Sequence, residues 1–304
     1  MNVSMHKPIG RYLKTNSEHV VFYQILGKGQ PVLVVHGGPG AGCSLNMADF
    51  FDLEKFMIIL VDQRGCGKST PNACINNNTT LDLINDFEAI RKQLKIEKWL
   101  LFGGSWGSTL SLVYAIYHPR VISGMVLRGV FLSTPKEISW LFQAAKYFNL
   151  QCWQDFTENL DNTGDILSLY YQKLTSNQPT IVATYAKRFA QMEATLSTLT
   201  ANQDMVEKFT APEFSKALAI IEVYYLKNNC FLPTKNYILD NIQIISHIPM
   251  KIVQGAYDLV CPPATAQKLH KHHINSTITL TTAGHSAFEP ETKIALTKAM
   301  LEFA

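Results

Sequence analysis

Several common signatures are missing from this chain of 304 residues. Its six cysteines form no Cys-x-x-Cys pair and match no zinc-ligand spacing with histidine. The most apolar short run, residues 56–61, has the length of a strand and is far too short to span a bilayer. The first ten residues hold no apolar segment like that of a secretory signal. We therefore expect a cytoplasmic protein with reduced thiols, no membrane anchor, no metal and no cofactor.

An excess of charge of one sign is also missing. The chain has 27 basic and 24 acidic residues, and its net charge of +3 is dispersed along the sequence. Proteins that bind nucleic acid or anionic lipid concentrate positive charge, so the composition argues against both partners. Apolar residues are plentiful instead. They make up 47% of the chain against 17% charged residues, as is typical of a globular protein with a sizeable core.

Short apolar runs alternate with segments of helical periodicity along most of the chain. The expected strands are residues 20–26, 32–35, 56–61, 99–102, 125–130, 252–254 and 277–281, and the expected helices are residues 81–94, 108–117, 263–273 and 289–303. This alternation predicts an α/β fold with a mostly parallel sheet that helices cover on both faces. Ligands of such sheets bind at the carboxyl ends of the strands.

The alternation stops between residues 133 and 236. This stretch has helical character throughout and holds 15 of the 32 aromatic residues of the chain. We interpret residues 133–236 as a helical cap domain inserted over the strand ends, with residues 1–132 and 237–304 forming the α/β core. The alternative is a separate domain with ordinary core helices.

The sequence Gly103-x-Ser105-x-Gly107 follows one expected strand and precedes one expected helix. A serine on such a tight turn has strained backbone angles, and its hydroxyl stands clear of the main chain at the edge of the sheet. The flanking glycines allow the strand and the helix to approach closely. Because a serine alcohol is a weak nucleophile, it needs a base nearby.

Two residues downstream are the partners that such a serine needs. Asp258 and His285 each follow an expected strand, on loops at the same sheet edge as Ser105. An isolated aspartate after a strand is more often a turn former or helix cap, and an isolated histidine is more often a surface or packing residue. The order serine, aspartate, histidine in this context instead predicts a catalytic triad, in which Asp258 orients His285 and His285 activates Ser105.

A glycine-rich loop, His36-Gly37-Gly38-Pro39-Gly40, follows an early strand. Acyl transfer needs backbone N–H groups aimed at the oxyanion of the tetrahedral intermediate, and glycines allow that close approach. We predict that Trp106, next to the serine, and Gly38 donate these N–H groups, with Gly37 as the alternative second donor. His36 is expected to hold the loop.

Two further patterns resemble ligand sites and are interpreted otherwise. Residues 61–70 end in Gly67-Lys68-Ser69 and imitate a phosphate-binding loop, but Asp62 stands where that motif needs its first glycine. We expect a supporting turn there, in which Asp62 and Arg64 pair with neighbouring loops. The histidines at positions 270, 272 and 273 are interpreted as a solvated helix end and not as a metal site.

Together these motifs resemble the prolyl aminopeptidases, also called proline iminopeptidases, of the α/β-hydrolase superfamily. The resemblance is carried by residues 36–40, 62–67, 103–108, 127–131, 257–262 and 283–290, in this order over nearly the whole chain. Gly-x-Ser-x-Gly alone is shared by many α/β hydrolases, whereas the full set is more specific. The resemblance implies an α/β-hydrolase fold and a metal-free serine exopeptidase that acts on peptides with a free N-terminal proline.

The resemblance also implies how the substrate is held. The family selects a free amino terminus with acidic cap residues, which match Glu193 and Glu222 here. A secondary ammonium that enters a closed pocket must be paired, because it loses its hydration there. By position, the candidates for an apolar slot around the proline ring are Phe131, Phe142, Phe231 and Cys261, and ordinary core packing is the alternative for each.

The cap departs from the family pattern near both glutamates. Two family tryptophans before the first glutamate are replaced by Phe189 and Met192, and an arginine and a histidine that flank the second are Ile220 and Tyr224 here. Because these changes alter the pocket wall, strict preference for proline stays open. The alternatives are a broader aminopeptidase, a hydrolase of small esters or amides, and a binding protein of the same fold without turnover. The intact triad argues against the last.

Overall fold

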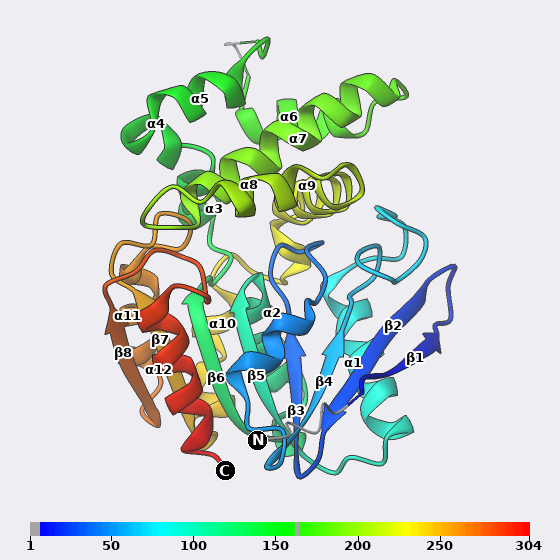
Figure 1. Ribbon diagram of the computed structural model, residues 1–304, viewed down its shortest axis with the longest axis vertical. Helices are drawn as coiled ribbons and strands as arrows, with labels where there is room; N and C mark the ends of the chain where they lie inside the picture. Colours follow the sequence, from blue (N-terminus) through cyan, green and yellow to red (C-terminus); the bar gives the residue numbers. More distant parts are fainter. Residues whose placement is uncertain (1–6, 162–163) are drawn as a thin grey trace.

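The computed structural model describes residues 7–161 and 164–304. Eight strands form one sheet in the order β1-β2-β4-β3-β5-β6-β7-β8 (Figure 1). Their bounds are β1 Ile9–Lys14, β2 Val20–Gly27, β3 Gln30–Val35, β4 Phe56–Val61, β5 Trp99–Ser105, β6 Ile122–Val130, β7 Met250–Gly255 and β8 Ser276–Thr281. The β1–β2 and β2–β4 pairs are antiparallel, and the pairs from β4 to β8 are parallel.

The strands separate two apolar cores, because successive side chains of a strand point to opposite faces of the sheet. Leu33 and Val35 pack on one face, and Val32 and Val34 pack on the other. The first face is covered by α1 (Thr80–Gln93), α2 (Trp106–Tyr117) and α11 (Pro263–His272), and the second by η1 (Leu45–Phe50) and α12 (Pro290–Leu301). Three short helices contact α2: η2 (Pro119–Val121), α10 (Tyr237–Asp240) and η4 (Ile242–Ile245). The predicted α/β sheet with both faces covered is confirmed.

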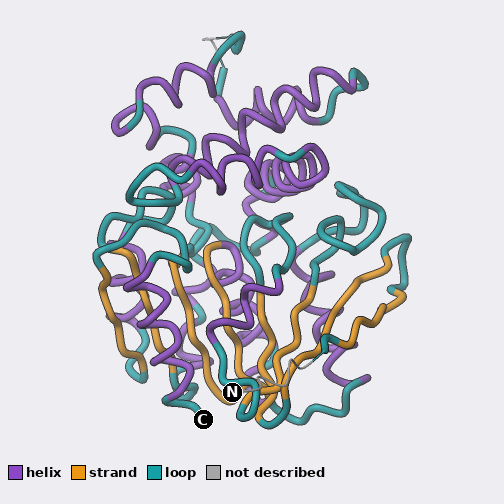
Figure 2. The backbone as a smooth tube through the Cα atoms, in the orientation of Figure 1, coloured by secondary structure: helices purple, strands orange, loops and turns teal. Residues whose placement is uncertain are grey.

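A second layer, made of helices, lies above the carboxyl ends of the strands (Figures 1 and 2). Its members, called the cap helices below, are α3 Pro135–Leu141, α4 Ala144–Phe148, α5 Leu150–Thr157, α6 Ile166–Leu174, α7 Pro179–Leu196, α8 Gln203–Thr210 and α9 Pro212–Lys227, followed by η3 Asn229–Phe231. Their aromatic side chains form a core of their own. The rings of Phe156 and Tyr170 stack with centroids 4.5 Å apart, and Phe189 packs against both. The described residues between 133 and 236 contain no strand.

The expected strands and helices of the α/β core are all present, with ends that differ by a few residues. β1 was not expected. Its side chains are almost all exposed, so no apolar alternation marks it in the sequence. Antiparallel hydrogen bonding to β2 along its whole length holds it at the edge of the sheet.

Two observations bear on the expectations drawn from composition. All six cysteines are free thiols, and four of them are buried. Across residues 7–161 and 164–304, no helix combines the length and apolar character needed to cross a membrane.

Candidate active site

Ser105 is the last residue of β5, and α2 begins at the next residue. Its φ of 58° and ψ of −129° lie outside the regions that a side chain normally allows. The turn requires its glycines. A Cβ on Gly103 would lie 2.4 Å from the carbonyl oxygen of Gly107, and one on Gly107 would lie 2.1 Å from that of Val35. The predicted strand–serine–helix turn is therefore present.

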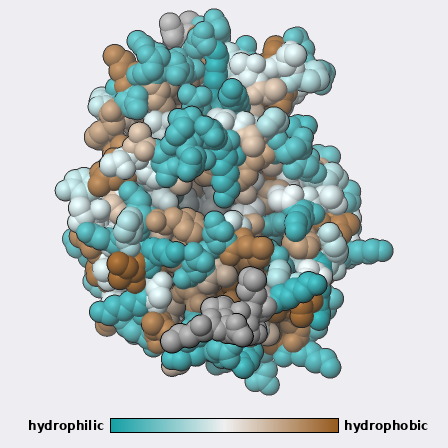
Figure 3. Space-filling model, viewed as in Figure 1, coloured by the Kyte–Doolittle hydropathy of each residue, from teal (hydrophilic) through white to brown (hydrophobic). Residues whose placement is uncertain are grey.

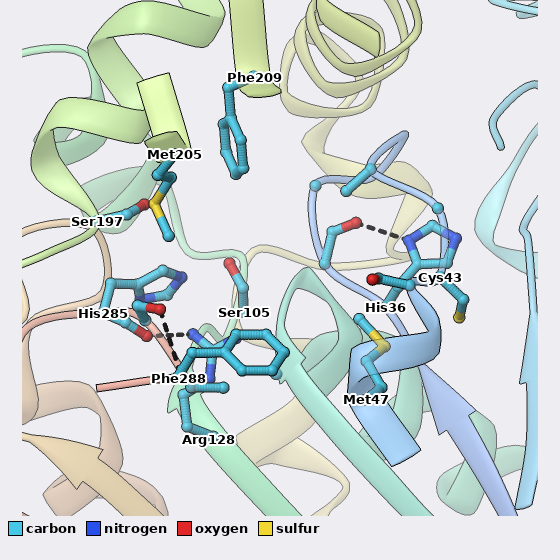
Figure 4. Close-up of a pocket in the computed structure, with 18 of the residues that line it drawn as sticks. His36, Cys43, Met47, Ser105, Arg128, Ser197, Met205, Phe209, His285 and Phe288 are labelled. Carbon is cyan, nitrogen blue, oxygen red and sulfur yellow. Dashed lines mark hydrogen bonds between the residues drawn. The ribbon is translucent and has the colours of Figure 1, made fainter. Parts of the chain in front are cut away.

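Asp258 and His285 meet beside this turn. Asp258 follows β7 and His285 follows β8, and the Nδ1 atom of His285 lies 2.8 Å from Oδ2 of Asp258. Both residues are buried, with 3% and 6% of their surface exposed. Ser105 and His285 line one cavity and point into it (Figure 4). The structure thus brings the three predicted triad residues together at one edge of the sheet.

Asp258 is held by three further donors. Its Oδ1 accepts from the backbone N–H groups of Val260 at 3.0 Å and Cys261 at 2.8 Å, and its Oδ2 accepts from Nε2 of Gln254 at 3.0 Å. Gln254 is fully buried in β7, and its Oε1 accepts from the Val130 N–H at 3.1 Å. Gln254 was not among the residues predicted from the sequence, although a polar residue near the end of an apolar strand is a signal for such a role.

The His285 imidazole is neutral near neutral pH. Burial lowers the pKa of His285, Asp258 raises it and Arg128 lowers it, with a net downward shift. A neutral ring can accept a proton, as a general base must. Arg128, on β6, donates from Nη1 to the His285 carbonyl oxygen at 2.6 Å. Its Nε is buried and has no hydrogen-bond partner among the described residues.

The glycine-rich loop after β3 lies against the serine turn. A Cβ on Gly37 would lie 3.1 Å from the Cβ of Ser105 and 3.8 Å from its Oγ. Gly38, at a φ of +97°, lines the same cavity. Both glycines therefore remain candidates for the second oxyanion donor, beside Trp106.

His36 holds this loop, as expected. Its Nδ1 lies 2.8 Å from the Gly37 carbonyl oxygen, and its Nε2 accepts from the Gln63 N–H at 3.0 Å. Burial lowers the pKa of His36, so the ring is neutral and can make both bonds. The Gln63 side chain in turn accepts from the Trp106 indole N–H at 2.9 Å, which joins the loop to the residue after Ser105.

The loop after β4 is a supporting turn. Asp62 accepts from the backbone N–H groups of Cys43 at 2.7 Å and Lys68 at 2.8 Å. Arg64 donates from Nε and Nη2 to the two carboxylate oxygens of Asp86, both at 2.7 Å. These pairs tie the turn to the loop after β3 and to α1, as the sequence predicted.

Glu193, on α7, and Glu222, on α9, meet because these two helices pack together. Their exposed fractions are 6% and 4%. Burial raises the pKa of Glu193 to about 7, and burial with the neighbouring Glu193 carboxylate raises that of Glu222 well above its ordinary value. Glu222, when protonated, can donate to the Glu193 carboxyl, and each side chain keeps one buried oxygen without a hydrogen-bond partner among the described residues. A cation between them would complete this site.

Two of the residues predicted for the proline slot lie on the β6–β7 side of Ser105. Phe131 directly follows β6, and its N–H and carbonyl groups bond the hydroxyls of Ser108 at 3.0 Å and Thr109 at 2.6 Å. Cys261 follows β7, and its backbone N–H donates to Oδ1 of Asp258 at 2.8 Å.

The other two predicted slot residues pack among aromatic rings. Phe231 lies with its ring centroid 5.1 Å from that of Tyr225, whose own ring centroid is 5.0 Å from that of Trp106. Phe142 packs against Phe189 in the aromatic core of the cap helices, at 6.1 Å between centroids. The structure therefore places Phe142 in that core, and none of the four predicted slot residues lines the cavity that holds Ser105.

A cavity of about 610 Å³ lies between the cap helices and the sheet. Ser105, His285 and Glu193 line it together with Gly37 and Gly38. In the space-filling view the surface is hollowed where the two layers meet (Figure 3). Ser105, His285 and one carboxyl of the buried pair therefore share one open site.

One group of described residues combines three potential metal ligands. Glu18, His19 and Cys74 offer ligand atoms within 4.8 Å of one another. None of the three lines the cavity that holds Ser105. This group therefore lies outside the candidate active site.

The fold is that of an α/β hydrolase. The sequence matches the family described as alpha/beta hydrolase fold over residues 30–292. An esterase from Exiguobacterium antarcticum superimposes with a TM-score of 0.68 at 19% identity, covering 97% of this chain and 99% of that one. A proline iminopeptidase from Mycobacterium smegmatis superimposes with a TM-score of 0.67 at 17% identity, covering 97% and 98%. Likenesses at such identities establish the fold alone.

Sequence relatives narrow the family. The chain is 43% identical over 283 residues to a probable proline iminopeptidase of Leptolyngbya boryana, covering 91% of this chain and 88% of that one. It is 40% identical over 298 residues to a proline iminopeptidase of Arabidopsis thaliana, covering 94% and 78%. The chain belongs to the proline iminopeptidase family, as its motifs predicted.

Proposed function

We propose that the chain is a serine exopeptidase that releases N-terminal proline from peptides through an acyl-enzyme. The observation that carries the proposal is the buried pair of Glu193 and Glu222 in the cap helices, with unpartnered oxygens. Such a pair favours a free ammonium group and disfavours a blocked amino terminus, which offers no charge. The relatives from Leptolyngbya boryana and Arabidopsis thaliana are named as proline iminopeptidases, which supports peptides with an N-terminal proline as the substrate.

The two layers of the fold have different proposed roles. We assign residues 1–132 and 237–304 to the catalytic core and residues 133–236 to the cap domain. Loops at the strand ends supply the reacting groups, whereas the cap helices supply the carboxyl pair. The six free thiols support a location in the reducing cytoplasm.

The substrate is held at its first residue. Glu193 and Glu222 bind the secondary ammonium of the N-terminal proline, and its ring lies against Phe131, Phe231 and Cys261. Two of these ring contacts come from the β6–β7 side of the serine, so the prolyl carbonyl is directed to the serine hydroxyl. Phe142 takes no part in this slot.

The chemistry begins at the serine. His285, oriented by Asp258, takes the hydroxyl proton of Ser105 as Oγ attacks the prolyl carbonyl carbon. His285 then gives that proton to the leaving amine, which frees the shortened peptide. A water molecule, deprotonated by the same imidazole, attacks the acyl-enzyme and releases proline.

Negative charge develops on the former carbonyl oxygen in both steps. The backbone N–H of Trp106 and that of Gly38, or of Gly37 in its place, stabilise this oxyanion. Trp106 is suited to the role because its N–H belongs to the first turn of α2, where helix N–H groups lack helical partners.

The test is arylamine release from proline, alanine and N-acetylproline arylamides. We expect cleavage of the proline substrate, much slower cleavage of the alanine substrate and none of the acetylated one. Equal cleavage of alanine arylamide would favour the broader aminopeptidase. Undiminished cleavage of the acetylated substrate would contradict the proposed binding of the amino terminus by Glu193 and Glu222. No cleavage of any substrate would overturn the proposal in favour of an esterase or a binding protein.

A further inference from the structure

The cavity extends beyond the residues that the proposed reaction uses. Its outer part, called the outer chamber below, is lined by apolar side chains from η1, α8, α9 and the loop after His285: Met47, Phe50, Met205, Phe209, Leu218 and Phe288. In Figure 4, Met205 and Phe209 project from α8 into the cavity, and Met47 and Phe288 lie across it.

The two sides of Ser105 differ in what surrounds them. Phe131 and Cys261 pack in the apolar core on the α2 face of the sheet, whereas Met47 and Phe50 pack in the core on the η1 and α12 face. The loop after β3 leads into η1 and contributes to the outer chamber. Phe131 after β6 and Cys261 after β7 do not line it. The proposed proline slot and this part of the outer chamber therefore lie towards opposite faces of the sheet, at whose strand end Ser105 stands.

The proposed reaction decides which of the two regions holds the proline and which holds the rest of the peptide. The acyl group and the leaving amine are attached to opposite sides of the carbonyl carbon that Ser105 attacks. His285 must reach the leaving nitrogen to protonate it, and Ser286, Ala287 and Phe288, which follow it, all line the cavity. With the proline ring on the face of Phe131 and Cys261, the rest of the peptide passes His285 and enters the outer chamber.

We propose that the outer chamber binds the second residue of the peptide substrate and favours a large apolar side chain there. The inference rests on the proposed release of N-terminal proline and adds the specificity for the residue behind it. Apolar walls disfavour a charged side chain that would be dehydrated without a partner. Met47 and Met205 are unbranched and flexible, so the chamber adapts to different apolar shapes.

The rim of the outer chamber is charged, unlike its apolar walls. Asp204 and Lys208, four residues apart on α8, line its edge and are exposed. Charged side chains at the mouth leave the following residues of the peptide in water. Specificity therefore ends at the second residue.

The experiment measures proline release from the dipeptide amides Pro-Phe, Pro-Leu, Pro-Gly and Pro-Asp. We expect kcat/KM for Pro-Phe amide to exceed that for Pro-Gly amide about tenfold or more, because a buried phenyl group gains the transfer free energy that glycine lacks. Pro-Asp amide is expected to be no better than Pro-Gly amide.

Two variants locate the effect. Met205→Ala and Phe209→Ala should each reduce the Phe-to-Gly ratio of kcat/KM about threefold or more, since each removes part of the chamber wall. Phe209 packs on Phe214 with ring centroids 5.0 Å apart, so its truncation also affects α8. Met205→Ala, at a half-buried position, makes the same test with less risk to the fold. Val206→Ala, the next residue on α8 and outside the cavity lining, is the matched control and should leave the ratio unchanged.

The outcomes separate the two proposals. Equal kcat/KM for Pro-Phe and Pro-Gly amides would overturn the outer chamber as a specificity site while proline release stands. A ratio that survives in both alanine variants would overturn the assignment to α8. Failure to release proline from any of the four amides would instead overturn the proposed function itself.

Discussion

Gln254 and Asp258 are joined by a hydrogen bond of 3.0 Å, from Nε2 of the amide to Oδ2 of the carboxylate. The same carboxylate oxygen lies 2.8 Å from Nδ1 of His285. Because the other end of the Gln254 amide accepts from the Val130 N–H, the amide links β6 to the acid of the proposed triad. A fully buried glutamine thus holds the carboxylate that we propose orients the base.

Gln254→Leu should lower kcat/KM for proline arylamide about 10- to 100-fold. It removes a buried hydrogen bond to a charged group, which is worth about 1.5–3 kcal/mol. Gln243→Leu, at an exposed position in η4, is the matched control and should leave kcat/KM unchanged. Full activity in a folded Gln254→Leu protein, checked by circular dichroism, would show that Asp258 needs no such support.

Two substitutions at Ser105 separate chemistry from backbone strain. Ser105→Ala and Ser105→Gly both remove the proposed nucleophile, and each should lower kcat/KM about 10⁴-fold or more. Glycine adopts a positive φ without strain, whereas alanine keeps its Cβ at the φ of 58°. We expect the glycine variant to have the larger free energy of unfolding in urea, by about 1 kcal/mol. The reverse order would contradict strain at the turn.

Glu222→Gln should stabilise the fold at alkaline pH. When the pKa of a carboxyl is higher in the folded protein than in the unfolded chain, the free energy of unfolding falls as the pH rises between the two pKa values. For Glu193 these pKa values are 4.5 in the unfolded chain and about 7 in the folded protein. At pH 8 the Glu222 carboxyl ionises freely in the unfolded chain but not in the buried pair, and glutamine removes this difference. The free energy of unfolding should exceed that of the unchanged protein by roughly 1–3 kcal/mol at pH 8, with a smaller difference at pH 5.

The control for this comparison is Glu213→Gln, an exposed position on the same helix. Urea unfolding of all three proteins at both pH values gives the numbers. A Glu222→Gln protein that is less stable than the unchanged one at pH 8 would contradict an uncompensated carboxyl pair.

The same pair predicts how activity depends on pH. The ammonium of the substrate needs an ionised carboxyl, and burial raises the pKa of Glu193 to about 7. We therefore expect kcat/KM for proline arylamide to fall as the pH drops through about 7. Glu193→Gln should lower kcat/KM and abolish this limb of the profile. The pKa of His285 is shifted downward, so its own protonation acts at lower pH. A limb near pH 7 that persists in Glu193→Gln would contradict the assignment.

Local sequence pattern was sufficient where neighbouring residues decide the structure. The strand ending at Ser105 and the helix after it are marked by apolar periodicity, and the glycines beside the serine are demanded by contacts within the turn and to the adjacent β3. The sequence did not predict β1, because its exposed residues show no apolar alternation. Hydrogen bonding to β2 keeps it in the sheet.

The order and spacing of residues along the chain determined the fold class, the serine turn and the candidates for acid and base, because periodicity and turn chemistry are local properties. Only the tertiary structure decided which side chains meet. It paired Glu193 with Glu222, inserted Gln254 behind Asp258, placed Phe142 in the aromatic core of the cap helices, and formed the outer chamber from η1, α8 and the His285 loop. Burial and contact between segments far apart in the chain depend on packing, which no local pattern records.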